Sequence, residues 1–473
     1  MLKRLVIVIF IMFGAFLSFS LYRTFAYDTS VVEEVPSTTD LEYTFKIGNS
    51  SIKQITVDSG ETRYYDIVLG NPNNAKISYS VYYEMVSPTT KPDGFSIGYT
   101  SKSTGTSTGK VDKNGNITLS IEASNTSSSA VTVKIGTVAG YVNGGELTLG
   151  SGQVVIPNGP VNAVELITKL NDDGSGDSGV YKVTHSAIPA SSSATGSEIP
   201  AVTDYRYYGP SPNNYICLDM EGQSTCPDKH LYRIIGSIYE EKENTNRIKV
   251  IKATPLTDGT TEGYAWDSGN VNIWATITNG NYSNSLTSGA SIMKLLNSGD
   301  WWNITNTFAN YGLTEKAKSY ITTSRYYLGG YNNSNGVMTN QFYAYERGTT
   351  RYDTNRPLYW DGYVGLMYPS DYGYAAGNSC VTGTDPYNYD GGCKNKDWLW
   401  MTTSSDYTNG YELLMSPDSG NSDFVFFVYS TGYVSDGNIS GMTFAARPVF
   451  YLSSSASISE GEGTSSNPYQ ITK

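Results

Sequence analysis

Apolar and polar side chains alternate along three segments in the first part of the chain. The alternation covers residues 77–85, 117–122 and 131–135, with aliphatic or aromatic side chains at every second position. A period of two indicates β-strands with one buried face. Clusters of turn-forming residues, such as Gly70-Asn-Pro-Asn-Asn74, separate the segments. The pattern predicts an antiparallel β-sandwich over residues 43–157, which we expect to act as a stalk without a site of its own.

A different pattern occurs near the end of the chain, where apolar side chains occupy both parities of Phe424–Tyr429. A strand of this kind is covered on both faces. We expect Trp398 and Trp400 to open an earlier strand, a hairpin turn at residues 430–432, and a closing strand over Ala446–Leu452. Buried strands that support an exposed segment are a common way to build a binding surface.

The exposed segment in this arrangement is Val434–Thr443, together with the aromatic residue on either side of it. Tyr433 and Phe444 would stack on a ligand or fill a pocket, while Asp436 and Asn438 would supply hydrogen bonds. The alternative is an inert hairpin tip. The predicted ligand-binding residues are Tyr433, Ser435, Asp436, Asn438, Met442 and Phe444.

The middle of the chain contains the pattern of further strands and short helices. Leu231–Ile238 and Arg247–Ala253 form a predicted hairpin, and Ser291–Asn297 forms a predicted helix. Thr314 is expected to cap another short helix that runs to Ile321. These elements indicate an α+β domain over residues 205–473.

A short helix and a linker are predicted between the sandwich and this second domain. Apolar residues at positions 161, 164, 167 and 170 have helical spacing. The segments 171–179 and 190–197 are rich in Gly, Ser and Asp or Ala, which favours a flexible connection. We therefore assign residues 158–204 to a helix plus a flexible linker.

The N-terminus has the pattern of an export signal. Lys3 and Arg4 precede Leu5–Tyr22, a run without charged residues, which as a helix would approach the thickness of a bilayer. The positive flank should stay in the cytoplasm and the remainder should be exported. Residues 1–26 are either an uncleaved anchor, which we favour, or a signal peptide cleaved near Ala26. Residues 27–42 would then form a tether.

The four cysteines form two pairs that are close in sequence, Cys217 with Cys226 and Cys380 with Cys393. Each intervening segment contains turn formers, so that its ends can meet. Neither pair has the spacing of a zinc site, and four cysteines in an exported chain favour disulfides. We expect both pairs to be bridged, with free thiols and a metal site as the alternatives.

Charge and composition narrow the class of partner. The chain of 473 residues has a net charge of −12, only 16% charged residues and 40 tyrosines. An acidic chain without a basic cluster is not a phosphate-tracking nucleic-acid binder, so we expect no nucleic-acid partner. Abundant Tyr with little charge is typical of a β-rich extracellular protein.

Motifs for catalysis are missing from the sequence. Its two histidines, His185 in the predicted linker and His230 beside Cys226, do not accompany a Gly-x-Ser-x-Gly, His-Glu-x-x-His or P-loop motif. Acidic residues such as Asp371, Asp385, Asp390 and Asp436 leave a carboxylate pair for glycoside cleavage open. Arg447 is predicted to be structural, with its guanidinium paired to an acid or to backbone carbonyls. We expect no catalytic residue, no cofactor and no obligatory metal.

The order W-L-W (398–400), F-V-F-F-V-Y-S-T-G-Y-V (424–434) and A-R-P-V-F-Y-L (446–452) resembles the end of bacterial surface domains with a C-type-lectin-like fold. This group includes relatives of the formylglycine-generating fold and the variable proteins of diversity-generating retroelements. The resemblance covers residues 205–473. It implies that ligand-facing residues lie just before the Arg-Pro-Val segment and that the loop region Gly329–Asp361 resembles an insertion next to the binding face.

The chain departs from two functional patterns of that group. Formylglycine-generating relatives use cysteines at the active site, whereas all four cysteines of this chain have a partner close in sequence, so that chemistry does not carry over. The calcium-binding triplets of calcium-dependent lectins do not occur in this sequence. In the first domain, the strand that begins Ile67-Val-Leu-Gly-Asn resembles those of Ig-like domains in exported bacterial proteins, at the level of fold alone.

The sequence thus predicts a mainly β chain: an anchor helix, an antiparallel β-sandwich and a C-type-lectin-like α+β domain. The expected function is recognition of a glycan or protein ligand at the exterior of a bacterial cell, with the membrane contacted through Leu5–Tyr22. The alternatives are an extracellular hydrolase or an inactive relative of one, and a structural component of a surface layer or fibre.

Overall fold

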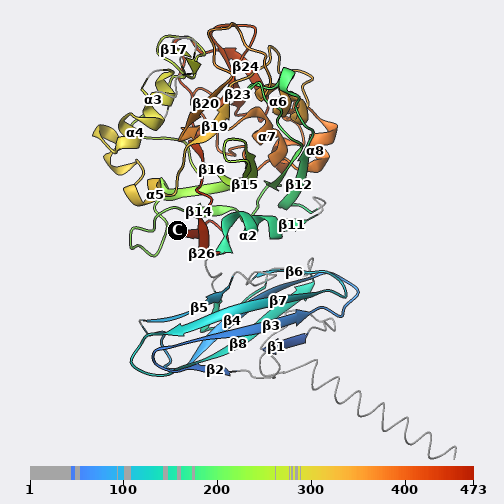
Figure 1. Ribbon diagram of the computed structural model, residues 1–473, viewed down its shortest axis with the longest axis vertical. Coiled ribbons are helices and arrows are strands. Elements are labelled where there is room, and N and C mark those ends of the chain that lie inside the picture. Colours follow the sequence, from blue (N-terminus) through green and yellow to red (C-terminus); the bar gives the residue numbers. More distant parts are fainter. Residues whose placement is uncertain are drawn as a thin grey trace, which may run out of the picture. The chain divides into compact units, whose positions relative to one another are not determined.

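The computed structural model describes residues 44–47, 54–92, 94–100, 108–141, 147–156, 161–172, 176–261, 263–275, 277–278, 281–282, 286–287 and 289–472. Contacts divide the chain into two compact units (Figure 1). Unit 1 comprises the described residues of Met1–Val161 with Ile458–Glu460, and unit 2 those of Asn162–Ser457 with Gly461–Lys473. The expected anchor Leu5–Tyr22, the cleavage site near Ala26 and the tether 27–42 lie outside the described residues.

Unit 1 is a β-sandwich, as the alternation predicts. One sheet has the order β1 (Thr44–Ile47), β3 (Glu61–Gly70), β7 (Asn116–Asn125) and β5 (Phe95–Tyr99). The other has the order β2 (Gln54–Val57), β8 (Val131–Tyr141), β4 (Ile77–Ser87) and β6 (Thr108–Val111), and β9 (Gln153–Val155) also pairs with β4. The strand pairs are antiparallel. Inward-facing side chains of both sheets, including Ile67, Leu119 and Ile135, form one apolar core.

Unit 2 is built on a larger mixed sheet. Its strands run in the order β27 (Tyr469–Thr472), β14 (Tyr215–Cys217), β15 (Leu231–Glu240), β13 (Val202–Tyr208), β12 (Gly179–His185) and β11 (Asn171–Asp172). β16 (Thr245–Lys252) joins β15 to β25 (Val449–Tyr451), which pairs with β21 (Val364–Gly365). The short strands β10 (Val161–Asn162) and β26 (Ser457–Glu460) span the points in sequence where one unit ends and the other begins.

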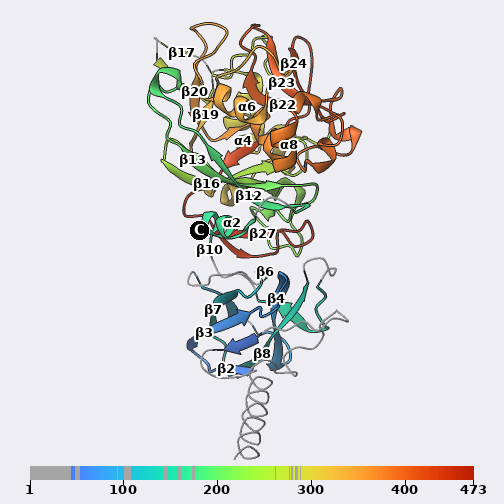
Figure 2. The same cartoon turned by 90° about the vertical axis from the view of Figure 1, so that its right-hand side faces the viewer.

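Smaller sheets and short helices complete unit 2. The sheets are β17 (Ile277–Thr278) with β18 (Asn281–Tyr282), β19 (Ser324–Tyr327) with β20 (Tyr359–Gly362), and β22 (Tyr411–Pro417), β23 (Phe424–Tyr429) and β24 (Val434–Asn438) in that order. The α-helices are α2 (Ala163–Lys169), α3 (Ser291–Asn297), α4 (Asp300–Asn303), α5 (Glu315–Ser319), α6 (Thr339–Glu346), α7 (Pro369–Ala375) and α8 (Asn378–Gly383). Single 3-10 turns are η1 (Ala190–Ser192), η2 (Asp228–His230), η3 (Asn306–Asn310), η4 (Pro386–Asn388), η5 (Lys394–Lys396) and η6 (Ser404–Asp406). Helix α7 contacts β22, and helices α6 and α8 both contact α7. Figure 2 shows α6 and α8 in the same part of unit 2 as β22, β23 and β24.

Buried ionic groups hold unit 2 together. Arg206 donates to Asp204 at 2.8 Å and to Asp371 at 3.0 Å, and Lys249 donates to the second oxygen of Asp371 at 2.5 Å. His185 shares a 2.9 Å hydrogen bond with Asp204. Burial alone would raise the pKa of Asp204 and Asp371, but the adjacent cations hold both below the ordinary range of an aspartate.

Several sequence predictions are confirmed. Phe424–Tyr429 is β23, the turn at 430–432 follows it, and Ser291–Asn297 is α3. Thr314 caps α5, because its hydroxyl accepts a hydrogen bond from the Ala317 N–H at 3.2 Å. Both disulfides form, Cys217–Cys226 and Cys380–Cys393.

The prediction of a flexible linker within residues 158–204 is wrong. β12 falls within 158–204, and β13 begins there at Val202. The two strands pair antiparallel over seven positions, and β13 also pairs with β15. His185 therefore lies on a strand and is buried. Ala194 is also buried, and its N–H donates to the Arg347 carbonyl at 2.8 Å. Small residues are common both in flexible segments and in closely packed ones, so the composition of this segment did not distinguish the two.

Three further expectations were wrong in detail. Trp398 and Trp400 lie in a turn instead of opening a strand, because the Trp400 N–H donates to the Asp397 carbonyl at 3.2 Å. Their indole N–H groups donate to the carbonyls of Tyr207 and Ser430. The closing strand is shorter than Ala446–Leu452, because β25 covers Val449–Tyr451. The loop-like region 329–361 contains helix α6, which buries Phe342 and Tyr343 on one face.

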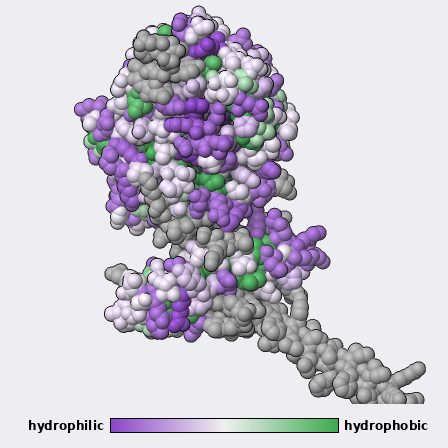
Figure 3. Space-filling model, viewed as in Figure 1, coloured by the Kyte–Doolittle hydropathy of each residue, from purple (hydrophilic) through white to green (hydrophobic). Residues whose placement is uncertain are grey.

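The described part of the chain contains no helix of the length and apolarity that a bilayer requires. On the face shown in Figure 3, hydrophobic residues are scattered among hydrophilic ones. The large hydrophobic side chains that are exposed among the described residues are Tyr64, Val86, Val154 and Tyr352.

A candidate ligand-binding pocket in unit 2

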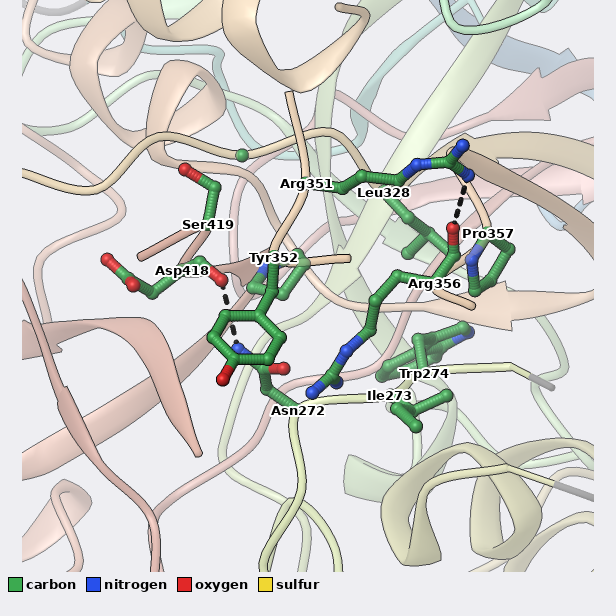
Figure 4. A pocket seen from close by; sticks show the side chains of 12 residues that line it. Asn272, Ile273, Trp274, Leu328, Arg351, Tyr352, Arg356, Pro357, Asp418 and Ser419 are labelled. Atoms are coloured by element: carbon green, nitrogen blue, oxygen red, sulfur yellow. Dashed lines mark hydrogen bonds between the residues drawn. The ribbon is translucent and has the colours of Figure 1, made fainter. Parts of the chain in front are cut away.

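A small hollow, partly open to solvent, lies where four segments of unit 2 meet (Figure 4). The segments are 272–274, 328–330 after β19, 351–357 before β20, and 417–419 at the end of β22. Gly330 permits this meeting, because a Cβ there would come within 2.1 Å of the Pro417 carbonyl oxygen. The pocket thus depends on close backbone approach between chain segments that are distant in sequence.

Asn272 and Asp418 form one wall and are each 1% exposed. The Asn272 amide donates to the carbonyls of Asp418 at 3.0 Å and Asn421 at 2.9 Å, but its oxygen has no hydrogen-bond partner. Oδ1 of Asp418 accepts from the N–H groups of Gly420 and Asn421, both at 2.7 Å, whereas Oδ2 has no partner. Two acceptor atoms are therefore fixed in place with their capacity unused.

Arg356 supplies donors on the opposite side and is 6% exposed. Its Nη2 donates to the Ser422 carbonyl at 3.1 Å, while Nε and Nη1 have no hydrogen-bond partner. Nε lies 4.0 Å from the Asp353 carboxylate. Burial lowers the pKa of Arg356, with Asp353 acting in the opposite direction. Arg351 donates to the Arg356 carbonyl at 2.7 Å and fixes the backbone of this segment.

Aromatic rings line the remainder of the pocket. Tyr352 is 45% exposed and its ring centroid lies 5.3 Å from the guanidinium carbon of Arg356. In Figure 4 its ring lies between Asp418 and Arg356. Trp274 is buried, makes an edge contact with Trp360 at 6.0 Å, and leaves its indole N–H without a partner. A ligand can stack on the exposed Tyr352 ring or displace it to reach the shielded polar atoms.

The arrangement suits binding more than bond cleavage. Buried donors and acceptors without partners occur among the lining residues. A hydroxyl group can pair with either kind, since it both donates and accepts. The lining residues include one carboxylate, Asp418, and no histidine or cysteine. They therefore lack the carboxylate pair of a glycosidase and the ligand set of a metal site.

The residues predicted as the binding face lie on β24, directly before it (Tyr433) and in the loop that follows it. β24 pairs with β23 on one side only, so the expected polar segment is an edge strand over its first half. Ser435, Asp436 and Met442 are half-buried, and Asn438 is exposed, with its amide donating to the Asp423 carboxylate. Tyr433 is half-buried and stacks on Tyr429 at 4.2 Å.

Phe444 requires a correction. It is 0% exposed and packs against Tyr411 at 5.9 Å and Phe427 at 6.0 Å. The ring therefore belongs to the core in this structure and does not face a ligand. The position of Phe444 directly after a polar segment did not indicate whether its ring points toward the core or toward solvent.

Asp436, on the predicted face, interacts electrostatically with Asp418 of the pocket. Burial raises the pKa of Asp418, and the negative charge of Asp436 raises it further.

Sequence reasoning missed Asn272, Arg356 and Tyr352 as site residues. Tyr352 and Arg356 do fall within Gly329–Asp361, the region that the family resemblance associates with a binding face. No sequence pattern marked Asn272 as a site residue, because its hydrogen bonds are made to backbone carbonyls of residues 418, 421 and 424, which are distant in sequence.

Comparisons with known proteins give little further information. No protein-family model matches the chain. No curated protein matches it either. Among solved structures, the ASH / PapD-like domain of human CEP192 (PapD-like domain 7) is similar to part of it, with 16% sequence identity and a TM-score of 0.14. That match covers 24% of this chain and 91% of the other, and it is too weak to support an argument.

Proposed function

We propose that this chain is an exported recognition protein whose unit 2 binds a hydroxyl-rich ligand, namely a glycan, without transforming it. The observation that carries the proposal is the pocket in which Asn272, Asp418 and Arg356 hold unpartnered acceptors and donors. Burying polar atoms without partners costs free energy, roughly 1–3 kcal/mol for each group. A ligand that supplies the missing hydrogen bonds would recover part of that cost.

The two disulfides support an extracellular location, because bridges of this kind persist in oxidising compartments. The expected anchor Leu5–Tyr22 would tether the chain at the bacterial cell surface, and the sandwich of unit 1 would act as the stalk. The resemblance of residues 205–473 to C-type-lectin-like domains supports the same proposal at the level of fold. In this proposal Tyr433, Ser435, Asp436, Asn438 and Met442 extend the contact surface beside the pocket.

The proposal is tested by binding of the intact chain to a glycan array, followed by titration of the best glycan. Tyr352→Ala removes a half-exposed ring and should weaken binding at least tenfold, about 1.4 kcal/mol, because stacking and aromatic contact area are lost. Asp418→Asn keeps the size of the side chain and should weaken binding by a similar factor. Tyr64→Ala, at a 68% exposed tyrosine of unit 1, is the matched control.

The outcomes separate the pocket from the neighbouring strand. Loss in Tyr352→Ala and Asp418→Asn, with normal binding by Tyr64→Ala, supports the pocket. Loss only in a Tyr433→Ala/Asp436→Ala double variant would move the site to β24. Equal binding by all variants, or no glycan bound by the wild-type chain, would overturn the proposal.

A further inference from the structure

Three side chains with metal-ligating atoms converge in unit 2 at a place that shares no residue with the pocket. They are Asp219, Glu221 and His230, and one ligand atom of each lies within 4.8 Å of the others. Asp219 and Glu221 follow β14, and His230 ends η2. One imidazole and two carboxylates form a donor set that suits zinc and other divalent transition cations better than calcium.

The Cys217–Cys226 disulfide holds this group together. Asp219 and Glu221 lie inside the ring that the bridge closes, and His230 follows four positions after Cys226. Within the ring the Glu221 N–H donates to Asp219 Oδ1 at 3.0 Å. The Leu218 N–H donates to the carbonyl of His230, outside the ring, at 3.0 Å. The three side chains are therefore constrained before any ion binds, which reduces the entropy lost on binding.

His230 is the observation that points to a ligand. It is 0% exposed, and neither ring nitrogen has a hydrogen-bond partner. Nε2 lies 3.6 Å from Glu221 Oε1, too far for a hydrogen bond and suitable for two ligands of one ion.

Two lysines neutralise the carboxylates in this structure. Lys229 lies 3.0 Å from Glu221 and Lys316 lies 3.2 Å from Asp219, while Thr314 donates to the second oxygen of Asp219 at 2.8 Å. The Lys316 side chain is 59% exposed, so its ammonium can return to water at little cost. The lysines would compete with a cation for the carboxylates. The Thr314 hydroxyl orients Asp219 through its hydrogen bond.

We propose that Asp219, Glu221 and His230 form a binding site for Zn²⁺ or a similar divalent transition cation, with the disulfide as its brace. The three protein ligands leave at least one coordination position for water or for a group from a partner molecule. Binding releases Lys316, and the His230 nitrogen that faces Glu221 gains the partner it lacks.

The test is calorimetric titration of the intact, oxidised chain with ZnCl₂ after removal of metals by a chelator, with CaCl₂ as the comparison ion. We expect one Zn²⁺ per chain and weak or no Ca²⁺ binding. Glu221→Gln and His230→Gln should each weaken Zn²⁺ binding at least tenfold. Lys316→Ala should tighten it, a result that a merely structural role for these residues would not give. Glu315→Gln, at a carboxylate that is 86% exposed nearby in sequence, should bind as the wild type does.

Glu221→Gln keeps the proposal falsifiable if His230→Gln fails to fold, because Glu221 lies at the surface. Cobalt substitution provides a second readout, since Co²⁺ in a site with few ligands gives visible absorption that Glu221→Gln should abolish. Failure of the wild-type chain to bind Zn²⁺, or binding that is unchanged in Glu221→Gln, would overturn the proposal. Neither result bears on glycan binding at the pocket.

Discussion

The two units of this protein differ in what their cores contain. In the described residues of unit 1, the buried side chains are apolar or neutral, with Asn71, Ser80, Ser120, Asn125 and Thr137 as the polar ones. In unit 2 the buried side chains include Asp204, Arg206, Lys249, Asp371 and Arg447, among other charged groups. Unit 1 is therefore stabilised chiefly by burial of apolar area, whereas unit 2 also depends on ion pairs that must stay complete.

Intrinsic tryptophan fluorescence can distinguish unfolding of unit 2 from unfolding of unit 1. All seven tryptophans lie between residues 266 and 400, within unit 2. Tryptophan fluorescence therefore follows unfolding of unit 2, and calorimetry follows both units. Each of the following changes should affect one unit and leave the signal of the other in place.

The largest effect is expected from Arg447→Ala. Arg447 is 3% exposed, and its guanidinium bonds both oxygens of Glu412 at 2.5 and 2.9 Å and the Leu399 carbonyl at 2.6 Å. This pairing confirms the structural role predicted from sequence. Removing one partner of a buried pair costs about 3–5 kcal/mol, because the other charge stays buried and unpaired. Denaturation followed by tryptophan fluorescence measures the loss. Arg447→Met combined with Glu412→Leu should recover most of it, and equal loss in the double variant would contradict the argument.

The matching change in unit 1 is Leu119→Ala. Leu119 is 0% exposed in the sandwich core, and truncating such a leucine costs about 2–5 kcal/mol through lost transfer free energy and a cavity. Calorimetry should show the effect in unit 1, while the tryptophan signal of unit 2 keeps its midpoint. A parallel fall of the fluorescence midpoint would show that the units unfold together. Leu119→Met, which keeps the volume, is the control and should cost under about 1.5 kcal/mol.

The Cys380–Cys393 bridge allows a third test of unit 2. It closes a segment of 13 positions between α8 and η5, and a loop of that length contributes about 3 kcal/mol in the chain-entropy model. Replacing both cysteines by serine should lower the fluorescence midpoint accordingly. Intact mass before and after alkylation checks the bridge in the wild type. No change in the midpoint would mean that the neighbouring packing alone fixes α8.

Stability should depend on pH in unit 2 and much less in unit 1. Burial raises the pKa of Glu346 to about 7, with Arg347 acting in the opposite direction. Between the ordinary glutamate pKa and about 7, the folded state keeps a proton that the unfolded chain has released. Stability therefore falls as pH rises through that window, by about 3 kcal/mol. Asp204 and Asp371, whose pKa values are lowered by Arg206 and Lys249, add stability that is lost in acid below the ordinary aspartate range.

Fluorescence-detected denaturation between about pH 2 and 8 covers the upper limb and the start of the acid limb. Glu346→Gln removes the titrating proton and should flatten the curve above about pH 4.5, while leaving the acid limb unchanged. A Glu346→Gln variant with the same slope as the wild type would assign the pH dependence to other groups.

The same difference in core composition explains what the sequence could and could not predict. In unit 1, Ile117, Leu119 and Ile121 read as a strand because apolar contacts alone decide which side chains are buried. In unit 2, Arg206 and Asp371 look like surface residues in sequence, and they meet in the fold although they are 165 positions apart. The site has the same origin, since Asn272 bonds carbonyls about 150 positions away. Short-range signals such as the Thr314 cap, the paired cysteines and β23 were predicted correctly because they depend on neighbouring residues.

The smallest predicted effect tests such a local signal. Thr314 accepts from the Ala317 N–H at the start of α5 and donates to Asp219. Thr314→Ala should destabilise unit 2 by about 1 kcal/mol, the usual contribution of a helix cap, and fluorescence-detected denaturation measures it. Thr314→Ser keeps the hydroxyl and should restore most of the loss. If Ser and Ala variants lose stability equally, the methyl group's packing matters more than the cap, and the local signal was correct for a different physical reason. Unit 1 has no helix among its described residues, so its calorimetric transition should not move in either variant.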